Sequence, residues 1–191
     1  MSVKIGVIIG SIRDGRQGET VAKWFLNEAN KIKASDVTLE LVDLKSFDLP
    51  LIGLNPSETQ LNDLKRWQET MSNLDGYVLV TPEYNHVVPG SLANAFQLLK
   101  PEVANKALAF VGYGFLGAAR AIVGFRAELA YQQIALVQQQ LNISFNVDYK
   151  DFGTPNQEFT PGAYHLVEIE TLMNQLTNWT KALKLVREHK I

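Results

Sequence analysis

Short apolar runs alternate with helical segments along this chain, and the alternation limits its possible folds more than any other feature. A run rich in β-branched residues, Val3–Ile9, predicts a strand, and apolar residues at helical spacing follow from Val21 to Ile32. Further strands are expected at 38–43, 76–81, 107–111 and 143–147, and further helices at 57–74, 91–96, 118–141 and up to residue 189. Five strands alternating with helices predict an α/β fold with a doubly wound, parallel sheet.

Some element boundaries carry local signals. Ser57 and Gln60 stand at the spacing of a capping box, which predicts a helix start at Ser57. The run 138–140, three glutamines, is interpreted as the solvated or interfacial end of the long helix 118–141. The stretch 148–162 is rich in Phe, Tyr, Pro and Gly; it is interpreted as an ordinary surface loop, and an aromatic loop at the edge of a pocket is the alternative.

Composition excludes several classes of protein. The net charge of −2 and the pI of about 5.9 leave no basic footprint for nucleic acid. The chain has no cysteine, so disulfides, cysteine nucleophiles and thiolate metal sites are excluded, and His165 and His189 lack metal-ligand spacing with carboxylates. No signal-peptide pattern is visible, and Val3–Ile9 is too short to span a bilayer. The sequence therefore predicts one domain over residues 1–191 of a cytoplasmic protein, without a metal and without a nucleic-acid or membrane partner.

The loop after the first strand has the composition of an anion site. Gly10–Gly18 joins a strand to a helix, and this arrangement directs backbone N–H groups and a positive helix end toward a phosphate. Ser11 adds a hydroxyl and Arg13 adds a charged fork. The spacing matches neither Gly-x-Gly-x-x-Gly nor the Walker pattern, and an ordinary βα loop with two solvated arginines is the alternative.

The loop after the third strand is the second candidate for ligand binding. Thr81–Gly90 is polar and aromatic, it contains Pro82 and Pro89, and it follows the apolar run Tyr77–Val80. Open parallel sheets bind ligands at the carboxyl ends of their strands. Two prolines stiffen the loop, so that several backbone amides can face one planar ligand. A turn without a ligand is the alternative.

Together the two loops resemble the NADPH-dependent FMN reductase family, the flavodoxin-like quinone, azo-dye and chromate reductases. That family carries Gly-Ser-x-Arg after its first strand, often continued as x-Gly-Arg-x-Gly-x-x-Val-Ala-x-Trp, and here Gly10–Arg13 and Gly15–Trp24 match it. It also carries Pro-Glu-Tyr-Asn and Pro-Gly-x-Leu-x-Asn-Ala, which Pro82–Asn85 and Pro89–Ala95 match. The resemblance implies a flavodoxin-like, doubly wound five-stranded parallel sheet with helices on both faces.

The chain departs from the family pattern at several positions. The family usually has Lys where this chain has Ala93, and often Ser where it has Val87. Its third flavin loop often reads Ser-Tyr-Gly-Gly, whereas here the loop is Gly112–Gly117. Phe115 and Leu116 in this loop are expected to reshape the pocket entrance, and with it the substrate preference.

The resemblance implies that FMN is held by three loops. The first loop would hold the phosphate, the second would follow the ring edge with backbone groups of Glu83 and Asn85, and the third would direct amides toward the N1 and O2 side. The residues implied to bind FMN are Ser11, Arg13, Gln17, Gly18, Glu19, Pro82, Glu83, Tyr84, Asn85, Gly112, Tyr113 and Gly114.

The activity implied by the resemblance needs no catalytic side chain. NADPH or NADH would pass hydride to the flavin N5, and a quinone, flavin, azo compound or similar small acceptor would then be reduced in a ping-pong cycle. Glu83 is therefore interpreted through its backbone, and His86 as a hydrogen-bonding loop residue rather than a general acid. Arg16 is a candidate partner for the 2′-phosphate of NADPH.

The expected helix 118–141 bears on the oligomeric state. Its apolar residues cover most of a helical wheel, so it would bury more than one face. A second subunit is the simplest cover, and the family it resembles forms dimers and tetramers; we therefore expect a homodimer or homotetramer. Cover by the C-terminal helix of the same chain is the alternative.

Two other functions remain open at this stage. One is a flavodoxin-type electron carrier without a substrate of its own, although flavodoxins are usually more acidic and have a Ser/Thr-rich phosphate loop. The other is a non-catalytic module that has lost the flavin, against which the intact Arg13 and Pro82–Asn85 argue.

Overall fold

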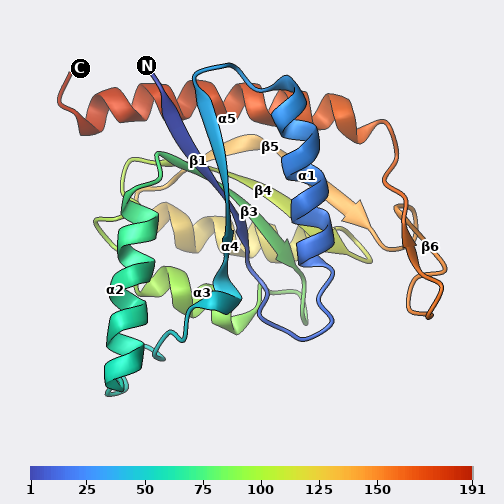
Figure 1. Ribbon diagram of the computed structural model, residues 1–191, viewed down its shortest axis with the longest axis horizontal. Coiled ribbons are helices and arrows are strands. Elements are labelled where there is room, and N and C mark those ends of the chain that lie inside the picture. Colours follow the sequence, from blue (N-terminus) through green and yellow to red (C-terminus); the bar gives the residue numbers. More distant parts are fainter. Residues whose placement is uncertain (191) are drawn as a thin grey trace.

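A computed structural model describes residues 1–190, and a five-stranded parallel sheet with the order β2-β1-β3-β4-β5 lies at its centre (Figure 1). This is the flavodoxin-like order, so the predicted α/β class is confirmed. The elements are β1 Val3–Ile9, α1 Gly18–Ile32, β2 Val37–Asp43, the 3-10 turn Leu44–Ser46, α2 Glu58–Ser72, β3 Gly76–Pro82, α3 Gly90–Gln97, β4 Ala107–Gly114, α4 Ala119–Tyr131, β5 Ala135–Ser144, β6 Tyr149–Lys150, β7 Glu158–Phe159 and α5 His165–Arg187.

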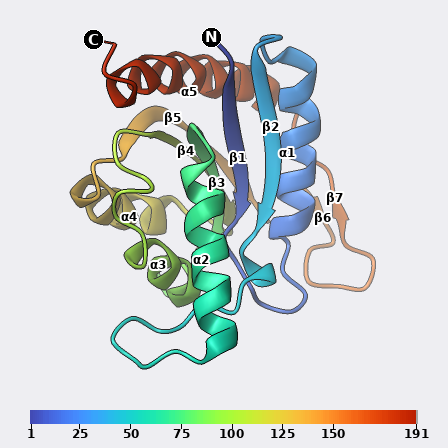
Figure 2. The same cartoon turned by 60° about the vertical axis from the view of Figure 1, so that its left-hand side comes forward.

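Helices cover both faces of the sheet. α1 and α5 lie on one face, and α2, α3 and α4 lie on the other (Figures 1 and 2). Because successive side chains of a strand point to opposite faces, Val7 and Ile9 of β1 join the core under α1 and α5, whereas Ile8 joins the core under the other helices. The three central strands β1, β3 and β4 are therefore buried on both sides, as their continuous apolar runs in the sequence indicate.

The capping box at the start of α2 is present. The Gln60 backbone N–H donates to the Ser57 hydroxyl at 3.2 Å, and the Ser57 backbone N–H donates to the Gln60 side chain at 3.1 Å. The local signal in the sequence is thus confirmed, since both residues satisfy donors that a helix start leaves without partners.

The prediction of one long helix over 118–141 is wrong for the second half of that range. α4 ends at Tyr131, and Gln133 takes a left-handed φ of +60° that turns the chain. The following strand β5 covers Ala135–Ser144 instead of 143–147, and its Ala135 N–H donates to the Lys106 carbonyl. The three glutamines at 138–140 lie within this strand and not at a helix end.

The misassignment has a physical cause and a consequence. Glutamine has no preference for strands, so residues 138–140 give no local strand signal. These residues form a strand because β4 supplies hydrogen-bond partners for their backbone. The register of this pairing is irregular between Leu108 and Phe110. The wheel that suggested a second subunit therefore combined a helix with a strand. That basis for the oligomer prediction is removed.

The segment 148–162, interpreted as a loop, contains a small antiparallel hairpin. β6 pairs with β7 through Tyr149 opposite Phe159 and Lys150 opposite Glu158. Figure 2 shows this hairpin beyond the lower end of α1, separate from the main sheet. Its position brings a C-terminal segment next to the loop that follows β1.

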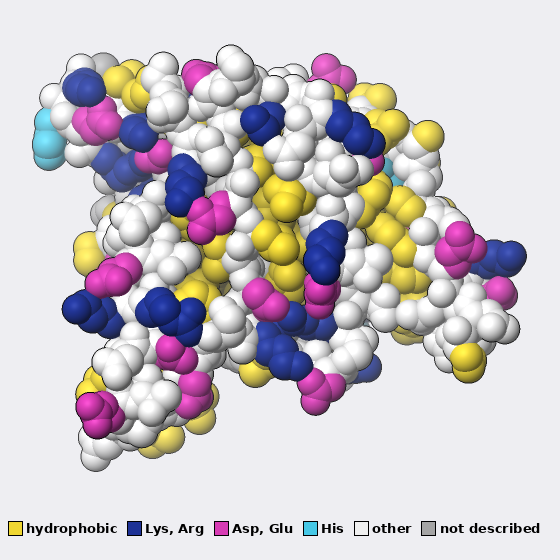
Figure 3. Space-filling model, in the orientation of Figure 1, with side chains coloured by type: hydrophobic (Ala, Val, Ile, Leu, Met, Phe, Trp, Pro, Cys, Tyr) yellow, Lys and Arg dark blue, Asp and Glu magenta, His cyan; other side chains and the backbone are white. Residues whose placement is uncertain are grey.

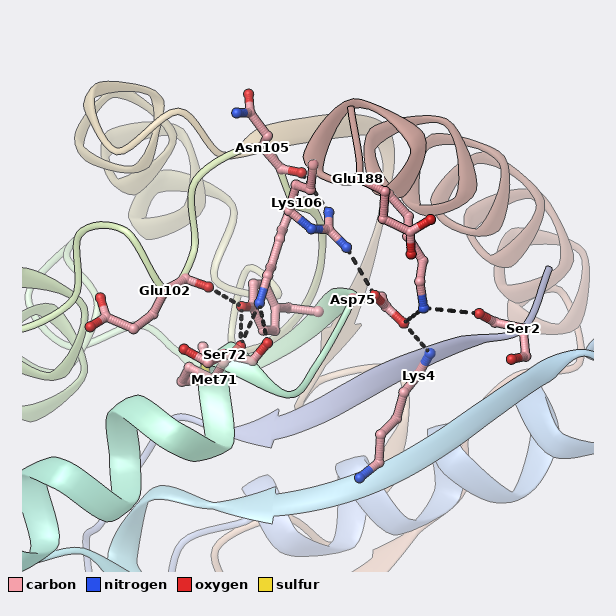
Figure 4. A network of polar contacts seen from close by, with 12 residues as sticks. Ser2, Lys4, Met71, Ser72, Asp75, Glu102, Asn105, Lys106 and Glu188 are labelled. Atoms are coloured by element: carbon pink, nitrogen blue, oxygen red, sulfur yellow. Dashed lines mark hydrogen bonds and ion pairs between the residues drawn. The ribbon is translucent and has the colours of Figure 1, made fainter. Parts of the chain in front are cut away.

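A polar network ties α5 to the amino ends of the strands (Figure 4). Asp75 accepts from the Lys4 backbone N–H at 3.0 Å, from Lys184 Nζ at 2.9 Å and from Arg187 Nη2 at 2.9 Å. These bonds hold the pKa of Asp75 below its ordinary value in spite of its partial burial. Within residues 1–190, no helix combines the length and apolarity needed to cross a membrane.

Candidate functional site

A cavity of about 740 Å³ lies at the carboxyl edge of the sheet. The chain leaves β1 and β3 toward opposite faces at this edge, and such a divergence is where open α/β sheets bind ligands. The volume falls in the usual range of small-molecule sites, about 300–1,000 Å³. Its lining consists of Arg13, Gly15, Arg16, Gln17, Pro82, Glu83, Tyr84, Tyr113, Gly114, Phe115, Phe145, Phe152, Gly153, Thr154, Pro155 and Gln157.

The α1 N-terminus at this cavity is uncapped. Gln17 precedes the helix in a right-handed conformation, and its side chain makes no capping hydrogen bond. The first intrahelical donor is the Val21 N–H, which reaches the Gln17 carbonyl at 3.1 Å. The N–H groups of the first turn, including those of Gly18 and Glu19, are thereby left to an external acceptor, and the helix dipole favours an anion there.

Arg13 extends from the same loop. Its side chain is exposed, it lines the cavity, and its guanidinium lies 5.9 Å from the centre of the Tyr84 ring. Among residues 1–190, no carboxylate forms an ion pair with Arg13. The positive charge beside the α1 N-terminus is therefore not neutralised by the protein.

Ser11 occupies a different position from the one expected of a phosphate ligand. It is fully buried, and its hydroxyl shares a 3.1 Å hydrogen bond with the Tyr84 hydroxyl. The Arg13 backbone N–H donates weakly to the same oxygen, at 3.4 Å. Ser11 thus ties the first loop to the second from beneath and does not line the cavity.

Arg16 is committed to another partner. Its guanidinium forms a two-pronged ion pair with Asp43 at the end of β2 and donates to the Ser11 carbonyl at 2.5 Å. Only 8% of its side chain is exposed. The Arg16 charge is therefore balanced inside the protein, which disfavours the role of a 2′-phosphate partner considered from the sequence.

The second loop is a tight hairpin turn. The backbone groups of Tyr84 and Val87 exchange hydrogen bonds of 2.9 and 3.1 Å, and Asn85 and His86 have φ values of +50° and +71°. Positive φ at both central residues defines a type I′ turn, which asparagine tolerates better than most residues. Asn85 and His86 are exposed and lie outside the cavity lining, whereas Pro82, Glu83 and Tyr84 belong to it.

The Glu83 carboxylate caps the neighbouring helix. It accepts from the backbone N–H groups of Arg120 and Ala121 at 3.1 and 3.2 Å, and from the Arg120 guanidinium. Burial would raise the pKa of Glu83, but the hydrogen bonds from Arg120 and Ala121 outweigh it and hold the pKa below its ordinary value. The carboxylate stays charged and fixes the second loop to α4, so it is not a free base.

Tyr113 lines the cavity, and the preceding Gly112 packs behind it. The Tyr113 hydroxyl is buried and has no hydrogen-bond partner among residues 1–190, and burial raises the pKa of this phenol. A Cβ added to Gly18 would lie only 2.6 Å from that hydroxyl, so glycine is required there. A Cβ on Gly112 would lie 2.1 Å from the Gly117 carbonyl oxygen, so Gly112 serves packing and does not line the cavity.

An aromatic wall completes the cavity; Phe115 was expected at the pocket entrance from the sequence, whereas the loop 148–162 was interpreted as a surface loop, with the edge of a pocket as the alternative. Phe145 and Phe152 stack with ring centres 3.8 Å apart, and Phe115 meets both edge-on at 5.6 and 6.0 Å. We call Phe115, Phe145 and Phe152 the aromatic wall. The signal was present as the density of aromatic residues between 145 and 159, but only the return of the hairpin beside α1 places it at the site. Figure 3 shows hydrophobic side chains gathered between α1 and this hairpin.

The site therefore has two unlike ends. One end offers uncapped backbone amides and the unneutralised Arg13, which suit a phosphate. The other end offers flat apolar rings, whereas the partnerless Tyr113 hydroxyl lies beside Gly18 at the first end. Such a cavity suits a molecule with an anionic tail and a planar ring. No group of three or more His, Cys, Asp or Glu within residues 1–190 is arranged to hold a metal ion.

The strand order and this crevice define a flavodoxin-like α/β protein with a cavity at the carboxyl edge of its sheet. A model of the family described as NADPH-dependent FMN reductase matches residues 3–148 of the chain. The chain therefore belongs to the NADPH-dependent FMN reductase family of enzymes, as the two loop motifs indicated.

Two curated relatives illustrate the family. A protein named NAD(P)H-dependent FMN reductase, from Nectria sp, is 31% identical over 126 residues, which cover 62% of this chain and 63% of that protein. A protein named NADPH azoreductase, from Bacillus sp., is 31% identical over 131 residues, which cover 67% of this chain and 69% of that protein. The matched region thus spans less than two thirds of the Nectria protein.

A solved structure supports the fold. The flavoenzyme FerB, an NAD(P)H:(acceptor) oxidoreductase from Paracoccus denitrificans, superposes with a TM-score of 0.69 over 94% of this chain and 98% of that chain. The sequences are 18% identical, so this similarity shows the fold alone.

Proposed function

We infer that the chain binds FMN in the cavity at the carboxyl edge and uses NADPH or NADH to reduce small acceptors such as quinones, free flavin or azo compounds. The observation that carries this inference is the uncapped α1 N-terminus beside Arg13, opening into a cavity whose far side is aromatic. We propose the whole of residues 1–191 as one FMN-binding domain; Ile191 lies outside the described residues.

The phosphate end would be held by the first loop. Arg13 would bind the phosphate oxygens with its fork, and the amides of Gln17, Gly18 and Glu19 would complete the cradle. Ser11 would act indirectly, because its buried hydroxyl holds Tyr84 and the first loop in register.

The ring end would be held mainly by backbone groups. Pro82, Glu83 and Tyr84 line the cavity, and Asn85 would contribute a backbone group from the turn beside them. Gly114 lines the cavity next to the buried Tyr113. Gly112 is proposed as a support for this strand end rather than a direct contact.

Bound FMN would supply a ring that accepts a hydride from NAD(P)H and returns two electrons to the acceptor. The protein would orient both substrates at one pocket and exclude water from it. Glu83 is held as a charged helix cap and His86 is exposed outside the cavity, so neither is proposed to transfer a proton.

Cofactor release tests the proposal. The purified protein should yield FMN and no FAD when it is heated and the supernatant is chromatographed, and FMN-free protein should bind added FMN at micromolar concentration. Recovery of FAD alone, or failure to bind FMN, contradicts the proposal.

Initial-rate kinetics test the reaction. NADPH and NADH should each be tried with a quinone and with an azo dye, and parallel lines are expected when one substrate is varied at several levels of the other. Intersecting lines contradict a single exchanging pocket. A protein that holds FMN but does not turn over with either nucleotide is an electron carrier instead.

A further inference from the structure

A buried histidine at the start of α5 lies between two carboxylates. The His165 side chain is 2% exposed, its Nδ1 atom lies 2.6 Å from Glu168 Oε2, and its Nε2 atom lies 3.1 Å from Asp148 Oδ1. Asp148 is fully buried, whereas 38% of the Glu168 side chain is exposed. We call these three residues the histidine bridge. They lie outside the lining of the cavity at the carboxyl edge.

The two contacts of the ring determine how many protons it carries. An ionised carboxylate only accepts hydrogen bonds, and a neutral imidazole has a single N–H donor. One nitrogen of a neutral His165 would therefore direct its lone pair at a carboxylate oxygen, and the two would repel each other. An imidazolium has two N–H donors, so it can serve both carboxylates, and its charge offsets the buried charge of Asp148.

The other partners of Asp148 indicate that this carboxyl group is ionised. It accepts from the Ser144 N–H at 2.8 Å, the Gly162 N–H at 3.2 Å and the Tyr164 hydroxyl at 3.1 Å. Burial, and then the hydrogen bond to Asp148, raise the pKa of Tyr164, so this hydroxyl keeps the proton that it donates. Both carboxylate oxygens are thus used as acceptors, and the proton of the bridge belongs on His165.

Aromatic rings surround the rest of His165. The ring of Tyr164 lies 4.2 Å away, and α1 contributes the Trp24 ring at 5.8 Å. Phe159 of β7 meets the same Trp24 ring edge-on at 5.5 Å. Among residues 1–190, the ion-pair partners of His165 are therefore the two carboxylates of the bridge.

The bridge holds both ends of the β6–β7 hairpin. The N–H donors of Ser144 and Gly162 flank the hairpin and meet at the Asp148 carboxylate, and the Thr160 N–H donates to the Asp148 carbonyl at 2.8 Å. Four residues between these ends line the cavity, namely Gly153, Thr154, Pro155 and Gln157. The charge of His165 therefore acts on one side of the cavity without touching it.

We propose that His165 is a charged bridge between Asp148 and Glu168, and that its loss of a proton as the pH rises loosens the β6–β7 hairpin at the cavity. Histidine is the side chain that ordinarily changes charge between pH 5 and 8. Because the folded hairpin requires the protonated ring, the stabilisation is present at lower pH and is lost as the pH rises. The bridge itself is independent of any ligand, and its effect on the cofactor rests on the proposed function.

Nitrogen-15 NMR of the full chain tests the charge of the ring. The spectrum distinguishes a ring with two N–H groups from a ring with one, and the exposed His86 and His189 give reference signals. At about pH 7, His165 should show two N–H groups. Glu168→Gln should lose the second proton at a lower pH than the wild type does. Glu170→Gln, an exposed position on the same helix, is the matched control and should behave as the wild type. A single N–H on His165 in the wild type, or equal behaviour of the two variants, overturns the charged bridge.

Amide hydrogen exchange tests the effect on the hairpin. Protection of the Thr160 and Gly162 N–H groups should fall by roughly three- to tenfold as His165 loses its proton, the difference between a charge-assisted and a neutral hydrogen bond. His165→Gln should show the lower protection at every pH. The Ala135 N–H, at the amino end of β5, reports on the rest of the fold and should show no such fall. Protection that does not follow the protonation of His165, or an equal fall at Ala135, overturns the proposal.

The release of FMN measures the consequence for the cavity. FMN should dissociate severalfold faster above the pH at which His165 loses its proton than below it, in the wild type and in Glu170→Gln but not in His165→Gln. Loaded wild-type protein whose release rate shows no such step overturns the claim that the bridge acts on the cavity. If the protein does not bind FMN, the proposed function fails, and the NMR and exchange measurements still decide on the bridge.

Discussion

The charged side chains that line the cavity differ in whether another residue of the protein already forms an ion pair with them. The Glu83 carboxylate is held by Arg120 and two backbone donors, and Arg16 is held by Asp43. Arg13 forms no ion pair within residues 1–190, although it lies beside a helix N-terminus. The positive charge of the site therefore depends mainly on this one side chain and on the amides behind it.

Replacing Arg13 should weaken cofactor binding without unfolding the protein. Arg13→Ala is expected to reduce FMN affinity by about 1.5–3 kcal/mol, the range for a hydrogen bond to a charged group. Fluorescence titration of FMN measures the effect. Arg66→Ala is a suitable control, since Arg66 binds Asp63 on α2, and its FMN affinity should equal that of the wild type. An unchanged dissociation constant for Arg13→Ala would place the phosphate elsewhere.

Lys106 is a buried charge at the opposite edge of the sheet (Figure 4). It is 4% exposed, and its Nζ atom donates to the Met71 and Ser72 carbonyls, each at 2.8 Å, at the end of α2. Burial, and then the nearby positive charge of Arg187, lower its pKa to about 8. Lys106 thus caps a helix end while the fold favours its neutral form.

The stability of the chain should therefore rise with pH through the Lys106 titration. Between pH 8 and 10.5 the folded state binds fewer protons at this lysine than the unfolded state does. At about 1.4 kcal/mol per pKa unit, the gain is at most about 3 kcal/mol. Urea unfolding at several pH values should show this slope in the wild type and in the control Lys65→Met, but not in Lys106→Met. A slope that persists in Lys106→Met contradicts the assignment.

At the scale of elements, α4 depends on a side chain from another part of the chain. Its N-cap, Ala118, has a left-handed φ of +57° and no side chain that can accept a hydrogen bond. The Glu83 carboxylate supplies the missing acceptor from the loop after β3. One residue thereby joins the second loop of the site to the helix that packs behind it.

Removing the Glu83 charge should destabilise α4 and loosen the site. Glu83→Gln is expected to lower the free energy of unfolding by about 1–2 kcal/mol, as for loss of a charged cap. The pKa of Glu83 lies below 4.5 in the folded state, so its stabilisation is present above pH 4.5 and is lost as pH falls through the folded pKa. The difference between wild type and Glu83→Gln in urea unfolding should therefore shrink under acid conditions. A constant difference at all pH values would refute the charged cap.

At the scale of the whole molecule, the expectation of a homodimer or homotetramer stays a prediction. α4 exposes 69% of Val123 and 90% of Tyr131, and a hollow of about 650 Å³ lies beside Tyr131 between the ends of α3 and α4. Association would remove these side chains from water. Light scattering at micromolar concentration should give at least twice the chain mass of 21.3 kDa. The mass of one chain would contradict the prediction. The cytoplasmic location likewise stays a prediction.

The sequence by itself determined the class of fold, the family and several residues of the first loop that line the cavity. Val3–Ile9, the capping box at Ser57 and the motif Pro82–Asn85 each depend on residues close together in the chain. Strand propensity, helix capping and turn formation depend on local interactions, so they can be predicted from the sequence without the rest of the molecule. Arg13, Gln17 and Tyr84, which the motifs single out, line one cavity, and their binding of FMN stays a prediction.

Only the tertiary structure decided where β5 lies and which contacts the side chains of the site make. Residues 135–144 became a strand because β4 offered backbone partners, and Ser11 became a buried support because Tyr84 meets it across the sheet edge. The commitments of Arg16 and Glu83 and the gathering of the aromatic wall depend on residues tens of positions apart. Such contacts form only when the sheet brings its strand ends together. No local pattern in a single sequence specifies which distant side chain will contact a given residue.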